Sequence, residues 1–138
     1  MQKRAILKWI SQNENIFIYV DESSIDEISD FLESKKIRRE KFRYVIALIL
    51  IGKSNKQQYG PEGFNDDTKY VTAIKCLQGS QNFRIYCQEL IDEENRKHII
   101  LVELLEKKKV QKQDKRIRQI IKRVAGYNYD IGNQEFTR

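Results

Sequence analysis

Hydrophobic residues recur with different periods in successive parts of the chain, and each period predicts one kind of element. Residues 16–20 are branched or aromatic throughout, which is typical of a β-strand. Apolar side chains then recur at helical intervals over 24–35, where Ser24 and Glu27 have the spacing of a capping box. A strand followed by a helix is therefore expected.

A second helix is predicted over residues 37–51. Its polar start contains strong helix formers, and Gly52 stands where a glycine commonly ends a helix. The apolar run 45–51 taken alone is also compatible with a buried strand. Residues 52–67 hold glycines, a proline and short polar side chains, which predicts a long loop, and long loops in small domains are often functional.

The period then changes to two. Residues 68–77 and 83–88 alternate between apolar and polar positions on either side of a turn at 78–81, which predicts a hairpin. Residues 98–105 follow as a third strand that is apolar on both faces at first, as a covered strand should be. The last periodic segment is an amphipathic helix, with its apolar stripe at Ile117, Ile120, Ile121 and Val124.

The order strand, helix, helix, three strands, helix predicts an α+β fold. We expect an antiparallel twisted sheet with the helices packed on one side. Residues 14–126 form the single predicted domain. Residues 1–13 are expected to be an N-terminal extension containing a short helix, and residues 127–138 a C-terminal tail.

Composition excludes several classes of protein. No apolar run reaches the ~18 residues that a membrane span needs, and the start lacks the pattern of a secretory signal, so a cytoplasmic protein is expected. The two cysteines, Cys76 and Cys87, are expected to be buried free thiols. The one histidine, His98, is expected to be structural, and we expect neither a metal site nor a cofactor.

The positive charge is concentrated near the C-terminus. Residues 107–123 hold nine Lys and Arg and one acid, so this segment carries +8 while the rest of the chain carries −2. Such a segment attracts polyanions by Coulomb attraction and counterion release. A solvated helix face is the alternative explanation. The uneven distribution favours a surface for nucleic acid or for an acidic protein.

Residues 69–88 and 99–112 resemble the RelE/ParE toxin superfamily, most closely its HigB-like branch. The shared pattern is a strand ending in Lys before a Gly turn, a strand with an Arg-Ile-Tyr core, an aliphatic strand, and Lys108-Lys109-Val-Gln-Lys112 entering a helix. The resemblance extends over roughly residues 15–125 in the order of elements. It implies a RelE-like fold and a bacterial toxin that is neutralised by a cognate antitoxin protein. Most such toxins cleave mRNA, commonly inside the ribosome, whereas another branch inhibits DNA gyrase without nuclease chemistry.

Metal-free RNA cleavage needs a base near the 2′-hydroxyl, a proton donor at the leaving oxygen, and cations for the phosphorane charge. The resemblance implies that Arg84 binds the phosphate through its guanidinium, although an ion pair on the sheet face is the alternative. Lys75, across the predicted turn, is expected on the same surface as a phosphate ligand or base, with an exposed strand lysine as the alternative. Lys108 and the proton donor Tyr127 complete the candidate catalytic set.

The candidate RNA-binding residues are Lys107, Lys109, Lys112, Lys115, Arg116, Tyr86 and Tyr129. The tyrosines are candidates for base stacking, and packing of the tail on the sheet is the alternative for Tyr127 and Tyr129. The chain lacks the His-containing cluster that HigB-like enzymes often carry. We therefore expect an mRNA endoribonuclease toxin, with a gyrase-inhibiting toxin or a non-catalytic nucleic-acid-binding module as alternatives. The expected partners are the antitoxin, which the basic helix could also bind, mRNA and the ribosome.

Overall fold

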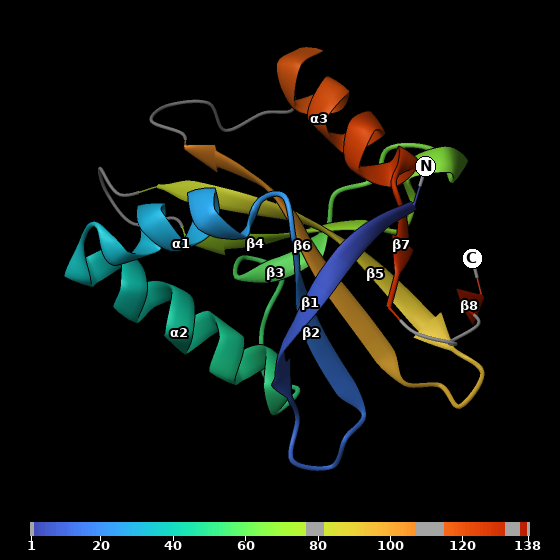
Figure 1. The fold of residues 1–138 in the computed structure, drawn as a ribbon, viewed down its shortest axis with the longest axis horizontal. Coiled ribbons are helices and arrows are strands. Elements are labelled where there is room, and N and C mark those ends of the chain that lie inside the picture. Colours follow the sequence, from blue (N-terminus) through green and yellow to red (C-terminus); the bar gives the residue numbers. More distant parts are fainter. Residues whose placement is uncertain (1, 77–81, 107–114, 132–135, 138) are drawn as a thin grey trace.

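One sheet runs through the whole molecule (Figure 1). The computed structural model describes residues 2–76, 82–106, 115–131 and 136–137. The strands are β1 (Gln2–Ile10), β2 (Ile16–Asp21), β3 (Tyr59–Pro61), β4 (Val71–Cys76), β5 (Phe83–Asp92), β6 (Lys97–Glu106), β7 (Asn128–Asp130) and β8 (Phe136–Thr137). The helices are α1 (Ile25–Glu33), α2 (Lys36–Leu50) and α3 (Lys115–Gly126), with a short 3-10 turn, η1 (Asp66–Thr68). The strand order is β3-β4-β5-β6-β2-β1-β7, and β8 pairs with the end of β5.

The sheet is mixed. β4, β5 and β6 form the predicted antiparallel meander, but β2 pairs with β6 in parallel, and so does β1 with β7. The expectation of a wholly antiparallel sheet is therefore wrong at two places. Parallel neighbours need a long connection, and the two helices and the meander between β2 and β6 supply one. The predicted α+β order is present from β2 to α3, with β1, β3, β7 and β8 in addition.

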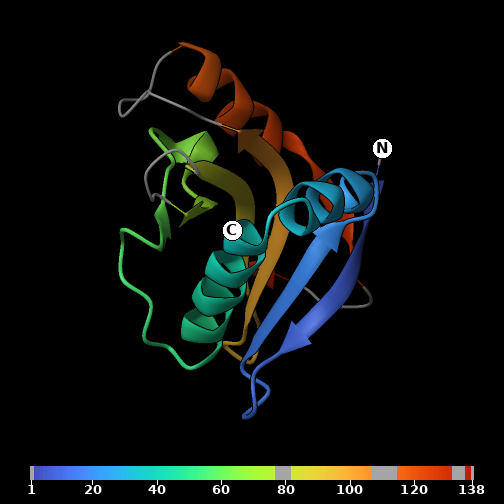
Figure 2. The ribbon, with the colours of Figure 1, turned by 90° about the vertical axis from the view of Figure 1, so that its left-hand side faces the viewer.

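Helices cover both faces of the sheet, so the expectation of helices on one side is wrong (Figures 1 and 2). On one face α1 and α2 pack over residues such as Ile85 and Ile99, and on the other α3 packs over Tyr86 and Ile100. Consecutive strand residues point to opposite faces. Because β5 and β6 are apolar at consecutive positions, each face needs its own cover.

Residues 2–10 form β1 of the sheet, and the predicted short helix is wrong. Ile6 lies opposite Val20 and Trp9 opposite Ile18, both on the α1 and α2 face, although three positions separate Ile6 from Trp9. A β-bulge between Leu7 and Trp9 supplies the extra residue that shifts the alternation. Because of the bulge, apolar residues on one face of this strand have the sequence spacing that is typical of a helix.

The helical hairpin agrees with the prediction, and the second predicted element is the helix α2, Lys36–Leu50, rather than a strand. Gly52 has a φ of 73°, the Gly52 amide donates to the Ile49 carbonyl and the Lys53 amide to the Leu48 carbonyl, at 3.0 and 2.9 Å. This is the glycine-ended pattern expected at a helix C-terminus. α1 begins directly after Ser24, but the Ser24 side chain makes no capping hydrogen bond. The predicted turn at 78–81 lies outside the described residues.

Candidate functional site

Two cations that the sequence predicted to share a surface do so. Lys75 on β4 lies directly opposite Arg84 on β5 in the antiparallel register. Residues opposite one another in such a pair point to the same face, with Cβ atoms about 5 Å apart. Lys75 is two positions from Ala73 and Arg84 is two positions from Tyr86, so both cations point to the α3 face of the sheet. The strand pairing alone therefore brings these side chains together.

A carboxylate bridges the two cations. Glu62 Oε2 lies 3.3 Å from Lys75 Nζ, and Glu62 Oε1 lies 3.1 Å from Arg84 Nη1. All three side chains are only 11–15% exposed. We call Glu62, Lys75 and Arg84 the Glu62 cluster. The alternative that the sequence left open for Arg84, an ion pair on the sheet face, is present in the structure.

The loop before β4 positions Glu62. The Glu62 amide donates to the Val71 carbonyl at 2.9 Å, which anchors the loop to the sheet. At Gly63 a Cβ atom would overlap the carbonyl of Thr68, so only glycine fits this close approach. Asn65 and Thr68 exchange side-chain hydrogen bonds across η1. The sequence predicted a functional loop at 52–67 but did not single out Glu62, because its contact depends on a chain reversal that periodicity does not show.

The cluster has the donors of an anion site. Two cations face one carboxylate, so the three side chains carry a net charge of +1. The Arg84 Nε atom is buried and has no hydrogen-bond partner in the described part of the chain. A phosphate presents oxygens to the same donors as a carboxylate does. A phosphodiester that displaced Glu62 would therefore find Arg84 and Lys75 already in place.

The predicted tyrosines do not join the cluster. Tyr86 is 0% exposed, so its ring cannot stack on a base, and that assignment is wrong. Tyr127 lies near Gln88, whose Nε2 donates to the Tyr127 carbonyl at 2.7 Å. Gln88 is four residues from Arg84 along β5, about 13 Å in an extended strand. The structure therefore does not bring Tyr127 to Arg84.

Tyr129 packs the tail onto the sheet, as the alternative for this residue proposed, and is no stacking platform. It is 9% exposed, and its hydroxyl donates to Asp21 Oδ2 at 2.5 Å. Burial, followed by the adjacent Asp21 carboxylate, raises the pKa of Tyr129 above its usual value. Burial alone would raise the pKa of Asp21, but hydrogen bonds from Ser23, Tyr129 and Lys3 outweigh it and lower that pKa.

The basic helix presents its cations to solvent. Lys115 and Arg116 are exposed at the start of α3, while Ile117, Ile120, Ile121 and Val124 are buried as predicted. Arg118 lies over the Phe64 ring, and Arg123 pairs with Glu103 on β6. The candidates Lys107, Lys108, Lys109 and Lys112 lie outside the described residues.

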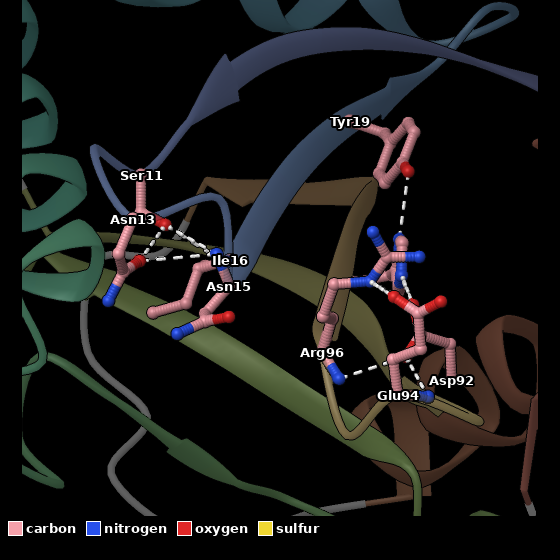
Figure 3. A network of polar contacts seen from close by, with 9 residues as sticks. Ser11, Asn13, Asn15, Ile16, Tyr19, Asp92, Glu94 and Arg96 are labelled. Carbon is pink, nitrogen blue, oxygen red and sulfur yellow. Dashed lines mark hydrogen bonds and ion pairs between the residues drawn. The ribbon is translucent and has the colours of Figure 1, made fainter.

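His98 belongs to a buried polar network at the far end of β5 and β6, in the structural role that was predicted. Its Nε2 lies 2.8 Å from Asp92 Oδ2, and its Nδ1 lies 2.8 Å from the Tyr19 hydroxyl. Asp92 also binds the Arg96 side chain and the amides of Glu94 and Arg96 (Figure 3). Burial by itself raises the pKa of Asp92, but these hydrogen bonds outweigh it and hold the pKa well below its usual value.

The described residues contain no group of three or more His, Cys, Asp and Glu side chains placed to hold a metal ion. No helix among them is both long enough and apolar enough to cross a membrane. Both cysteines are free and buried, as predicted.

No model of a known protein family matches this chain, and searches of curated proteins and of solved structures found no match either. Assignment of function therefore depends on the residues and their geometry.

Proposed function

We propose that this protein is the toxin of a type II toxin–antitoxin system, a RelE-like endoribonuclease that acts in the cytoplasm on mRNA in the ribosome. The observation that carries the proposal is the Glu62 cluster, in which Lys75 and Arg84 hold one carboxylate on one surface. The motifs of residues 69–88 and 99–112 support the toxin class, and with it a cognate antitoxin as partner.

The proposed reaction is an in-line transfer that needs no metal. The 2′-hydroxyl attacks the adjacent phosphorus, Glu62 accepts the hydroxyl proton, and the 5′-oxygen leaves with a proton from a lysine ammonium, that of Lys75 or Lys108. The products are a 2′,3′-cyclic phosphate and a 5′-hydroxyl. Arg84 stabilises the charge on the phosphorane oxygens with preformed donors. Glu62 releases Arg84 as the phosphate enters, which leaves its carboxylate free to act as the base.

The phosphate backbone on either side of the scissile bond is assigned to the basic segment. Lys115 and Arg116 are exposed at the start of α3, and neither forms an ion pair with another described residue. Lys107, Lys109 and Lys112 precede them in the chain and extend the same run of charge. Long-range attraction of RNA to this run would concentrate substrate at the cluster.

The test is Arg84→Ala, compared with Arg39→Ala. Arg39 makes a matched ion pair, since its Nη1 lies 3.1 Å from Glu33 Oε2, but it stands on α2 across the sheet from the Glu62 cluster. We expect Arg84→Ala to lower mRNA cleavage by translating ribosomes about 100-fold or more and to abolish growth arrest on induction. Arg39→Ala should cleave and arrest growth as the wild type does. Wild-type cleavage by a folded Arg84→Ala protein, with folding checked by circular dichroism, would contradict the proposal.

A non-catalytic RNA-binding module is the second candidate. It is favoured by the pairing of both cations with Glu62 and by the full burial of Tyr86, which leave the exposed cations of α3 as the contact surface. RNA binding by the wild type without any cleavage would support this module. Inhibition of DNA supercoiling without RNA cleavage would instead place the protein in the gyrase-inhibiting class.

A further inference from the structure

A groove lined by residues of β1, α1 and α2 opens on the face of the sheet opposite α3. Figure 2 shows how these three elements are arranged. Its volume is about 490 Å³. The floor is apolar and reaches the core at Val20, Ile28, Leu32, Phe42, Ile46 and Leu101. Concave apolar sites with a few polar groups at the rim are typical of binding sites.

The β-bulge in β1 shapes this groove. Lys8 and Trp9 are consecutive residues, and both line it. In a regular strand their side chains would point to opposite faces of the sheet. Lys8 is the extra residue between the pairs Leu7–Tyr19 and Trp9–Ile18, so the bulge turns a cation and an indole towards the same space.

The rim of the groove is basic. Lys8, Arg39 and Arg43 stand on it, with Glu33 as the one acid among its lining residues. Glu33 is already paired with Arg39, at 3.1 Å. Within the described part of the chain, neither Lys8 nor Arg43 makes an ion pair. The groove thus combines an apolar floor with two uncompensated cations.

Two of the side chains that line the groove are small and exposed. Ser29 on α1 and Ala47 on α2 both line it. Short side chains at these positions let the backbone of another helix approach closely while its larger side chains enter between α1 and α2. An amphipathic helix laid in a groove is a recurring mode of peptide recognition.

We propose that the groove binds an acidic amphipathic helix of a partner protein. The apolar side chains of that helix enter the groove beside Trp9, and its carboxylates lie at Lys8 and Arg43. The Glu62 cluster lies on the other face of the sheet, so the proposal stands or fails independently of RNA cleavage.

Trp9 is the one tryptophan of the chain, so its fluorescence reports directly on occupancy of the groove. The probes are three synthetic helical peptides: one with Leu on one face and Glu on the other, a twin with Lys in place of Glu, and a twin with Ala in place of Leu. We expect the Leu–Glu peptide to shift the Trp9 emission saturably. Each twin should bind about tenfold more weakly or worse, since one loses charge complementarity and the other its apolar anchors.

The variants Arg43→Glu and Ala47→Phe test the assignment from the side of the protein. Both positions are exposed, so both variants should fold. Each variant should bind the Leu–Glu peptide about tenfold more weakly than the wild type does. Lys122→Glu makes the same change of charge on α3 and should bind as the wild type does. Equal binding of the Glu and Lys peptides, no saturation with the Leu–Glu peptide, or equal affinity of Arg43→Glu and Lys122→Glu would overturn the proposal.

Two alternative occupants of the groove can each be detected by a separate measurement. Detection of either one would also overturn the proposal. Saturable binding of dodecanoate at Trp9, with no response to the Leu–Glu peptide, would assign the groove to a small amphipathic anion. A dimer seen by sedimentation and dissociated by Ala47→Phe would show that a second copy of the chain covers the groove.

Discussion

At the scale of single residues, buried charges in this protein are held by several partners each. Asp21 receives hydrogen bonds from Ser23 and Tyr129 and an ion pair from Lys3 at 3.1 Å. Asp92 likewise accepts hydrogen bonds from the Arg96 amide and side chain, and its Oδ2 contacts His98 Nε2. A buried carboxylate persists in its charged form only when such donors replace the lost water.

We predict that Asp92→Asn lowers the free energy of unfolding by about 2 kcal/mol at pH 7, because charged hydrogen bonds to buried groups are lost. The folded-state pKa of Asp92 is depressed, so its contribution is complete above the unfolded-state pKa of about 3.9 and declines as pH falls below it. The difference in stability between wild type and Asp92→Asn should therefore shrink below about pH 4. Urea unfolding at a series of pH values measures it.

The matched control is Asp26→Asn, which changes an exposed acid in the first turn of α1. This variant should alter stability by less than about 0.5 kcal/mol. Equal stabilities of wild type and Asp92→Asn at pH 7 would show that the network around His98 contributes nothing net.

At the scale of elements, residues close in the chain determine where each helix ends. The sheet determines which of its faces each helix covers. α2 ends at a glycine in the left-handed region, whereas α3 ends at Gly126 without a positive φ. The buried stripe of α3 was predictable from spacing alone. Its place on the face opposite α1 and α2 was not.

We predict that Gly52→Ala lowers stability by about 1 kcal/mol, because a side chain in the left-handed region strains the backbone. A Cβ atom at Gly52 meets no other atom within 4 Å, so backbone strain is the whole effect. Gly126→Ala is the matched control, since its Cβ is also unobstructed; it should be neutral or slightly stabilising. Thermal unfolding compares the two, and an equal loss in both variants would contradict the strain argument.

We predict that the double variant Lys115→Gln, Arg116→Gln weakens RNA binding. The slope of log K against log salt concentration should fall in magnitude by about 1.4, because two phosphate contacts to a single strand are lost. Filter binding to a single-stranded RNA at several salt concentrations measures the slope. An unchanged slope would place the RNA-binding surface away from the start of α3.

At the scale of the whole molecule, one sheet separates two apolar cores, and both cysteines lie in the core beneath α1 and α2. Burial raises the pKa of the Cys76 thiol to about 12, with Lys41 opposing it, and burial raises the pKa of Cys87 further. Only thiolates react readily with disulfide reagents.

Both thiols should accordingly resist Ellman's reagent at pH 8 in the folded protein and react fully in guanidinium chloride. Cys76→Ser should halve the number of thiols that react in denaturant, which checks the count. Rapid labelling of the native wild type would contradict the burial of this core.

The spacing of apolar residues was sufficient to predict the elements that have a regular period. It did not predict β1, which has a local irregularity. The helical hairpin, α3 and the pairing of Lys75 with Arg84 follow from regular patterns. β5 and β6 were also predicted although their pairing has a register shift at Tyr86 and Cys87, because β6 is apolar at consecutive positions. β1 was not, because its bulge shifts the alternation by one residue. Tyr86 was assigned to RNA because alternation shows which residues share a face but not which face is covered.

The sequence by itself determined the periods, and through them the α+β class, the order from β2 to α3 and the buried stripes of α1 and α3, because backbone geometry ties side-chain direction to position in the chain. The face predicted for α2 was wrong in part, since Ile37 and Tyr44 are exposed while Phe42 and Ile46 are buried. Only the tertiary structure decided that α3 covers the second face, that β2 pairs in parallel with β6, and that Glu62 meets Lys75 and Arg84. These are contacts between segments far apart in the chain. They are selected by which apolar faces remain to be covered after the sheet forms, and no local pattern records that choice.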